Sequence, residues 1–176
     1  MARLSWLQRL YWRHLSKPVA YRPLFQHVLE QPIGSILEIG IGNGQRLKQV
    51  LSLLTIQPGV SQLRYAGVDP FESGNPSEGH LRLKDVHRML AEQNIKAHLI
   101  PGEASSSLQR VAHTVLPSDL LIIDSGWGEN SANGEALVQW LPRLAHENSA
   151  IFARQNQASP LVRIQLPSVS ELRKAA

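Results

Sequence analysis

Short apolar segments alternate with longer amphipathic segments along most of the chain, and this alternation restricts the fold more than any other feature. The apolar segments have the length of strands, and the amphipathic ones have helical spacing. Strands are predicted at residues 35–39, 63–68, 97–100, 120–124 and 150–154, and helices at 44–54, 79–93, 103–113 and 131–145. Such alternation is typical of a mostly parallel sheet with helices on both faces. The sequence therefore predicts a three-layer α/β/α fold.

Two further amphipathic helices are predicted before the first strand, at residues 3–15 and 18–30. After the fifth strand, residues 161–166 can add one short strand. We expect a single domain over residues 1–176, with a helical extension at 1–32, a core at 35–155 and a shortened C-terminus.

Composition excludes several kinds of chemistry. The 176 residues are 43% hydrophobic and 18% charged, which is typical of a globular domain. Cysteine is absent from the sequence, so disulfides, thiolate metal sites and cysteine nucleophiles are excluded. The seven histidines show no helical metal-site spacing, and no metal is expected. No apolar stretch approaches the ~20 residues of a transmembrane helix, and we expect a cytoplasmic protein.

A glycine-rich loop follows the first predicted strand and precedes a predicted helix. Residues 38–44 read Glu-Ile-Gly-Ile-Gly-Asn-Gly. Glycines let the backbone turn tightly and approach a ligand, and asparagine also tolerates left-handed backbone angles. The dinucleotide fingerprint G-x-G-x-x-G does not fit, because neither Gly40 nor Gly42 has a glycine five residues further on.

The spacing of this loop, E-x-G-x-G-x-G, resembles the first motif of class I S-adenosylmethionine-dependent methyltransferases. Its four fixed positions are Glu38, Gly40, Gly42 and Gly44, with Asn43 between the last two. The resemblance covers residues 35–155 and implies a Rossmann-like methyltransferase fold with S-adenosylmethionine as cofactor. It also implies that Glu38 holds the cofactor's amino-acid end, while the glycine backbone curves around the sulfonium and ribose.

Acids follow the second and third predicted strands. A carboxylate at the tip of the second strand, Asp69, can accept both ribose hydroxyls of an adenosine, and Pro70 and Phe71 beside it can pack on adenine. Alternatively, Asp69 simply ends a strand and opens a turn. The resemblance implies that Glu103, next to Ala104, faces the adenine amino group, although it can also be an ordinary first-turn acid.

The fourth predicted strand ends at Asp124-Ser125-Gly126-Trp127, where the resemblance places the methyl acceptor. Asp124 is a candidate general base and Trp127 a candidate acceptor wall. Both can instead complete the strand and the core. The segment lacks the two prolines of the tetrad found in methyltransferases that act on exocyclic nucleobase or glutamine nitrogens, which disfavours that class.

The leading hypothesis is an S-adenosylmethionine-dependent methyltransferase of unknown acceptor, with a small molecule favoured over RNA. The alternative is an S-adenosylmethionine-binding module with degenerate catalysis that acts as an interaction or regulatory subunit. A nucleotide-binding oxidoreductase is disfavoured by the glycine spacing.

The start of the chain is basic and aromatic. The first acid of the sequence is Glu30, and Trp6, Tyr11 and Trp12 stand among the preceding basic residues. Those basic residues are Arg3, Arg9, Arg13, Lys17 and Arg22. Such a segment can bind RNA or an anionic membrane surface, or can simply cover the core with its arginines in solvent.

Overall fold

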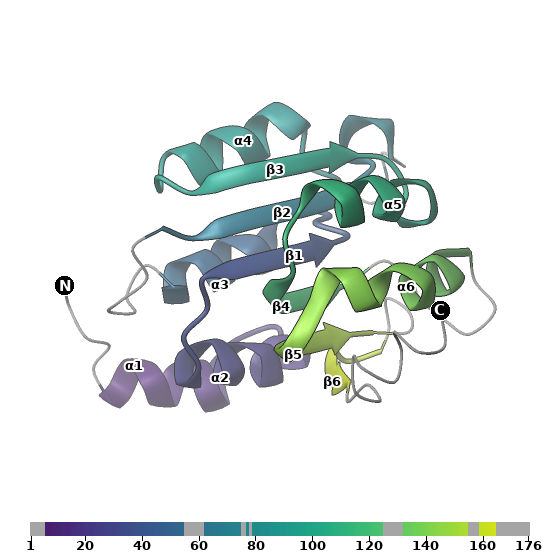
Figure 1. Ribbon diagram of the computed structural model, residues 1–176. Coiled ribbons are helices and arrows are strands. Elements are labelled where there is room, and N and C mark those ends of the chain that lie inside the picture. Colours follow the sequence, from purple (N-terminus) through teal and green to yellow (C-terminus); the bar gives the residue numbers. More distant parts are fainter. Residues whose placement is uncertain are drawn as a thin grey trace.

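A six-stranded sheet with the order β3-β2-β1-β4-β5-β6 runs through the middle of the molecule (Figure 1). The computed structural model describes residues 6–54, 62–74, 77, 79–124, 132–154 and 159–164. The strands are β1 (Ser35–Ile39), β2 (Arg64–Asp69), β3 (Lys96–Pro101), β4 (Ser118–Ile123), β5 (Ala145–Ala153) and β6 (Val162–Ile164). The first five strands pair in parallel, and β6 pairs antiparallel with β5.

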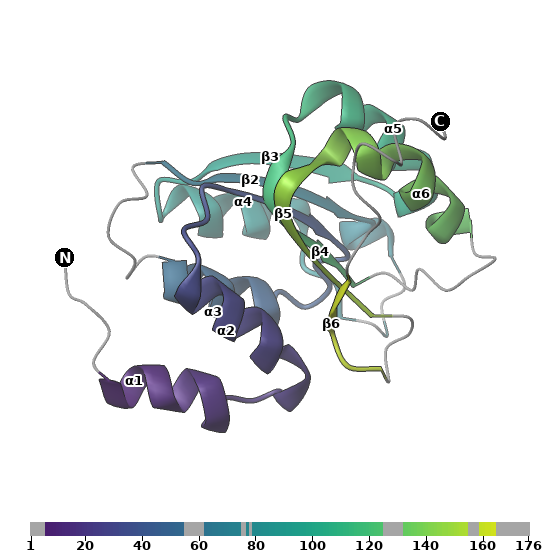
Figure 2. The same cartoon turned by 60° about the horizontal axis from the view of Figure 1, so that its bottom comes forward.

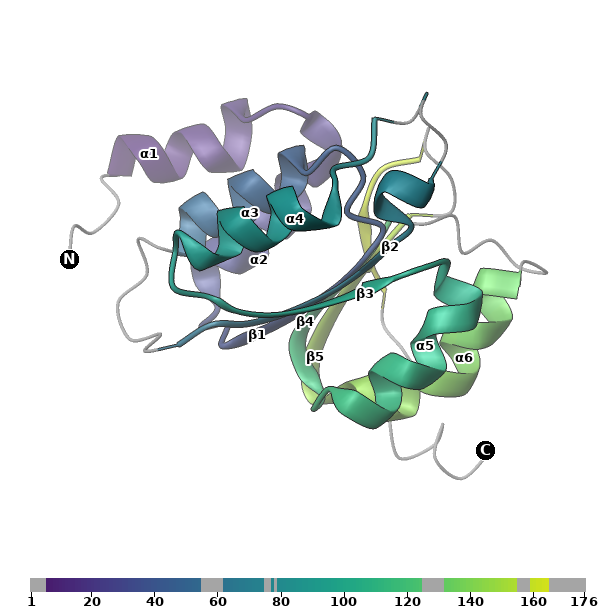
Figure 3. The same cartoon turned by 90° about the horizontal axis from the view of Figure 1, so that it is seen from above.

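Helices cover both faces of this sheet, as the alternation predicts (Figure 3). One face carries α2 (Arg22–Glu30), α3 (Gln45–Leu54) and α4 (Leu83–Ala91), and the other carries α5 (Ala104–Thr114) and α6 (Ala132–Leu144). Successive strand residues point to opposite faces. Each face therefore has its own hydrophobic core. Leu120 and Ile122 of β4 join the core under α2, α3 and α4, and Leu121 and Ile123 join the core under α5 and α6.

The N-terminal segment forms a continuous helix, with α1 (Trp6–Leu10) followed by a π-helical stretch, η1 (Tyr11–Leu15). A 3₁₀ turn, η2 (Val19–Tyr21), leads into α2. Trp12 packs edge-on against Phe25 of α2, with ring centroids 5.2 Å apart. The predicted helices at 3–15 and 18–30 are thus present, the first of them described from residue 6.

Most element boundaries lie within two residues of the sequence prediction, and two differ by four or more. The helix predicted from residue 79 begins at Leu83, whose backbone amide donates to the Glu72 carboxylate over 2.8 Å. Strand β5 begins at Ala145 instead of residue 150, because its polar first half is held by hydrogen bonds rather than by an apolar pattern. His146 donates through its backbone amide to the Ser149 hydroxyl, and its Nε2 lies 3.1 Å from the Oδ1 of Asp119 in β4.

The strand order reverses at β1. The chain first builds β2 and β3 on one side of β1 and then crosses to β4 on its other side. In open α/β sheets, ligands bind at the carboxyl ends of the strands at such a reversal. This topology directs attention to the loops after β1, β2 and β4.

Candidate functional site

The loop after β1 turns tightly at three glycines. Gly40, Gly42 and Gly44 have φ angles of 84°, 59° and 71°, a region that side chains with a Cβ rarely adopt. A Cβ on Gly42 would have no neighbour within 4 Å, so this position faces open space. A Cβ on Gly44 would lie 2.3 Å from the Cδ1 of Leu81. The tight turn predicted from the sequence is therefore present, with one glycine open and one packed.

Asn43 belongs to the same loop and is exposed. Its side-chain oxygen accepts a hydrogen bond of 3.0 Å from the backbone amide of Gln45, the first residue of α3. Asn43 therefore stabilises the start of the helix that follows the loop.

Asp69, the last residue of β2, ties this loop to the neighbouring strand. Its Oδ2 accepts from the Gly42 amide over 2.8 Å, and its Oδ1 accepts from the Phe71 amide over 2.7 Å. Phe71 is buried and has a φ of 50°, unusual for a residue with a side chain. The carboxylate itself is fully buried. It holds the loop after β1 and the short helix η3 (Phe71–Ser73) in one arrangement.

His80 and Leu81, in the loop that precedes α4, cover this arrangement. The Nδ1 of His80 lies 2.9 Å from Asp69 Oδ1, and the Leu81 amide donates to the Gly42 carbonyl over 2.9 Å. Leu81 also packs on Gly44. Residues 80–81 therefore lie over the carboxylate and the glycine loop together.

Glu38, in β1 below the loop, is buried and fully paired. Its Oε1 accepts from Arg46 Nε over 2.8 Å, and its Oε2 accepts from the Tyr65 hydroxyl over 2.6 Å. Burial and then the nearby Glu38 charge raise the pKa of Tyr65 well above its usual value, so Tyr65 remains a protonated donor. Arg46 also donates to the Gly40 carbonyl and so ties α3 to the start of the loop.

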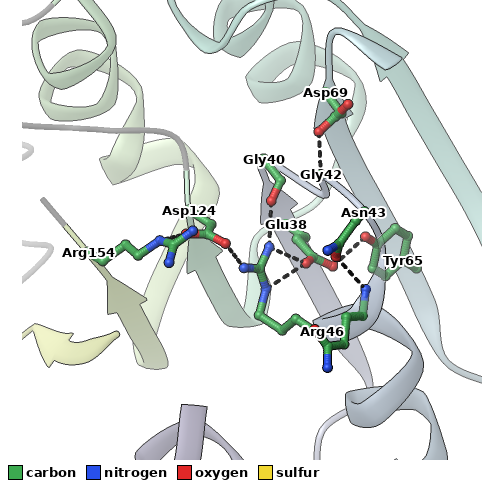
Figure 4. A network of polar contacts seen from close by, with 10 residues as sticks. Glu38, Gly40, Gly42, Asn43, Arg46, Tyr65, Asp69, Asp124 and Arg154 are labelled. Atoms are coloured by element: carbon green, nitrogen blue, oxygen red, sulfur yellow. Dashed lines mark hydrogen bonds and ion pairs between the residues drawn. The ribbon is translucent and has the colours of Figure 1, made fainter. Parts of the chain in front are cut away.

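Arg46 extends this pairing to the carboxyl ends of β4 and β5. It forms an ion pair with Asp124, whose other carboxylate oxygen pairs with Arg154 (Figure 4). The side chains of Arg46, Asp124 and Arg154 are 2%, 7% and 16% exposed. Glu38, Arg46, Asp124 and Arg154 thus form a row of alternating charge across three neighbouring strands, which we call the charge row.

The structure brings most of the sequence-predicted site residues together at the carboxyl ends of the strands. They are Glu38, Gly40, Gly42, Asn43, Gly44, Asp69, Pro70, Phe71 and Asp124. Glu103 is exposed and Ala104 buried at the start of α5; the adjacent Gly102 amide donates to the Asp69 carbonyl over 3.0 Å, which keeps them near these strand ends. Trp127 lies outside the described residues. No group of three potential metal ligands occurs among the described residues.

Sequence reasoning missed four residues of this region: Arg46, Tyr65, His80 and Arg154. One signal was available for Arg46, which stands among buried apolar positions of an amphipathic helix. A charged side chain at an inward position requires a buried partner. The other three depend on contacts between segments distant in sequence.

No helix within the described parts of the chain is long and apolar enough to cross a membrane.

No protein-family model matches this sequence, and no curated protein is similar to it in sequence. Solved structures are similar in fold. The methyltransferase PaMTH1 of Podospora anserina, bound to S-adenosylhomocysteine (SAH), has a TM-score of 0.50 at 14% identity. The match covers 80% of this chain and 53% of that one. Fibrillarin of Aeropyrum pernix, with natively bound S-adenosyl-L-methionine, has a TM-score of 0.49 at 21% identity, over 81% of this chain and 55% of that one.

The chain therefore has the Rossmann-like fold of class I methyltransferases, and the sequence-based prediction of that fold is confirmed. The chain spans about half the length of these two solved structures.

Proposed function

We propose that the chain is an S-adenosylmethionine-dependent methyltransferase whose cofactor binds over the loop after β1. The observation that carries this proposal is the contact between Gly42 and Asp69. An open, positive-φ glycine is held by a buried carboxylate at the tip of the next strand, beside the point where the strand order reverses. The similar fold of PaMTH1, a methyltransferase described with SAH, supports the same function.

The charge of the region favours a cationic ligand. Glu38, Asp69 and Asp124 provide three carboxylates, and Arg46 and Arg154 provide two guanidinium groups. One carboxylate is therefore in excess. A sulfonium cation suits this balance, whereas the pyrophosphate of a dinucleotide would add negative charge to it. The open space over Gly42 leaves room for close approach to the backbone.

Asp69 fits the ribose-binding role once the His80 ring moves aside. Both carboxylate oxygens are engaged, but a carboxylate has about four lone-pair sites, and only the His80 contact comes from a side chain. In this proposal the ribose hydroxyls replace the His80 ring at Asp69. Pro70 and Phe71 then pack beside adenine, and Glu103 and Ala104 contact its amino-group edge.

Glu38 acts on the amino-acid end of the cofactor mainly through Arg46. A ligand has no direct access to the Glu38 carboxylate, because the residue is only 1% exposed and lies behind its partners Arg46 and Tyr65. Glu38 instead holds Arg46 against the Gly40 carbonyl and so fixes the first turn of the loop. This assigns Glu38 a positioning role within the predicted cofactor site.

Asp124 stays the proposed base, under a condition set by the charge row. S-adenosylmethionine supplies an electrophilic methyl group, and the acceptor, a small molecule in this proposal, loses a proton as it takes the methyl. Asp124 can take that proton only if one of its two arginine partners moves away. Arg154 is the more exposed partner and is the one we propose to move. Trp127 would line the acceptor side.

Calorimetric titration with S-adenosylhomocysteine and with NAD tests this function. We expect micromolar binding of S-adenosylhomocysteine alone, and binding about 10- to 100-fold weaker in Asp69→Ala, which removes charge-assisted hydrogen bonds. Asp85→Ala, at a partly exposed carboxylate of α4 that pairs with Arg82 and Arg88, is the matched control and should bind normally. A thermal melt checks that each variant is folded.

Two other results would change the assignment. Failure of the folded wild-type chain to bind S-adenosylhomocysteine would contradict the proposed function. Binding without methyl transfer to any of a panel of acceptors would favour the alternative, a cofactor-binding module with degenerate catalysis.

A further inference from the structure

The N-terminal helix carries large apolar side chains on its solvent side. Five of them are between 44% and 71% exposed: Trp6, Leu7, Leu10, Tyr11 and Leu15. We call these five residues the outer face. Val19 continues it beyond the helix and is 60% exposed.

Among the described residues, this helix contacts the rest of the molecule mainly through Trp12 and Arg13. Neither α1 nor η1 contains a buried residue, and the main contact inward is that of Trp12 with Phe25. Figure 2 shows α1 beside α2, away from the sheet. A surface helix normally turns its apolar stripe toward the core. Here the apolar stripe faces outward, which marks an interaction surface.

The helix itself carries basic side chains and no acidic ones. Arg9, His14 and Lys17 are exposed on or just after the helix, and no acid occurs before Glu30. Arg13 pairs with Glu30, so part of the positive charge of the segment is already balanced. Arg9 and Lys17 supply the charge complementary to an anionic partner.

The side chains of the outer face distinguish between anionic partners. Single-stranded nucleic acid is held by aromatic rings that stack on bases, together with cations along the backbone. Three of the five outer-face residues are leucines, which cannot stack. An interfacial helix instead combines leucine and tryptophan on one face with arginine and lysine beside them. A second copy of the chain would bring like charges together around a symmetric contact.

We propose that the outer face binds the surface of an anionic lipid bilayer, with the helix lying in the plane of the interface. Trp6, Leu7 and Leu10 enter the boundary between headgroups and acyl chains, while Arg9 and Lys17 contact anionic headgroups. This inference does not depend on the cofactor or on methyl transfer.

Sedimentation of the full chain with sucrose-loaded vesicles tests it. We expect binding to vesicles of phosphatidylcholine with about one third phosphatidylglycerol, and much weaker binding to phosphatidylcholine alone. Each basic side chain near an anionic surface strengthens binding about fivefold. The double variant Arg9→Gln/Lys17→Gln should therefore lose about 25-fold, and added salt should weaken wild-type binding.

Matched variants test whether the outer face is the part that binds. Leu7→Gln/Leu15→Gln removes two exposed apolar side chains of the outer face and should abolish sedimentation. Leu116→Gln/Val138→Gln removes two side chains that are equally exposed elsewhere, at 67% and 65%, and should leave binding unchanged. Brominated lipids should quench wild-type tryptophan emission more than that of Trp6→Phe.

Several results would overturn the proposal. One is no sedimentation with anionic vesicles. Another is an equal loss of binding in Leu7→Gln/Leu15→Gln and in Leu116→Gln/Val138→Gln. A third is a concentration-dependent dimer that Leu7→Gln/Leu15→Gln disrupts while the wild-type chain does not bind vesicles. Tight binding to single-stranded RNA without vesicle binding would also overturn it and would identify a nucleic-acid surface instead.

Discussion

Arg46 of α3 donates from its Nε to the Oε1 of Glu38 in β1 over 2.8 Å, inside the core. The helix that follows the glycine loop is therefore fixed to the strand that precedes it. The same guanidinium reaches Asp124 at the end of β4. One side chain thus couples the conformation of the loop to the neighbouring part of the sheet edge, where the proposed base lies.

Replacing Arg46 by methionine should destabilise the fold. The variant leaves the Glu38 and Asp124 carboxylates buried beside each other without their common partner, and breaking a buried ion pair costs about 3–5 kcal/mol. Urea unfolding should show this loss in the free energy of unfolding. Lys48→Met, an exposed position of the same helix, should change stability by less than about 0.5 kcal/mol. Equal stability of Arg46→Met and wild type would contradict the charge row.

Replacing His80 by alanine should strengthen binding of S-adenosylhomocysteine. The His80 ring occupies an oxygen of Asp69 that the proposed ribose contact needs. Removing one competing hydrogen bond corresponds to about a two- to tenfold gain in affinity. Calorimetry measures this directly, with His87→Ala on exposed α4 surface as the control. Weaker binding in His80→Ala would show that the ring supports the ligand instead of covering the site.

Gly42 and Gly44 should respond differently to alanine. Both substitutions impose left-handed strain of roughly 1–2 kcal/mol. Gly44→Ala also pushes against Leu81, so its loss of stability should be larger by about 1–3 kcal/mol. Gly42→Ala meets no neighbour and should instead weaken S-adenosylhomocysteine binding. Thermal melts and calorimetry on both variants check this, and the reverse order of effects would contradict the geometry.

Asp119, near the amino-terminal end of β4, should make the stability of the fold depend on pH in the acidic range. Burial acts to raise the pKa of Asp119, but hydrogen bonds from Ser35, Gly34 and His146 outweigh it and hold the pKa below the usual 3.8. A lowered pKa in the folded state stabilises the fold above the unfolded value, and this contribution is lost as the pH falls through the folded value.

Asp119→Asn should therefore show a smaller loss of stability between pH 7 and pH 3 than wild type does. Urea unfolding at several pH values measures the difference, with Glu92→Gln on exposed surface as the control. Parallel pH curves for wild type and Asp119→Asn would show that these hydrogen bonds contribute nothing to acid sensitivity.

Local patterns predicted the fold well because each element of the core carries its own signal. Strand β1 was predicted with its observed bounds, since an apolar run meets glycines that cannot continue it. The charge row was not predictable in the same way. Arg46, Asp124 and Arg154 meet only after α3, β4 and β5 have packed together. The position of His80 over Asp69 likewise depends on a loop conformation that has no periodic signal.

Hydrogen exchange with and without S-adenosylhomocysteine tests the central claim most directly, because it shows where the ligand binds. We predict slower exchange in peptides covering residues 40–48 and 69–74, and unchanged exchange in peptides covering residues 145–149 at the far end of the sheet. NAD should leave all of these peptides unchanged. Protection confined to the far end of the sheet, or no protection by saturating S-adenosylhomocysteine, would contradict the assignment of this loop as the cofactor site.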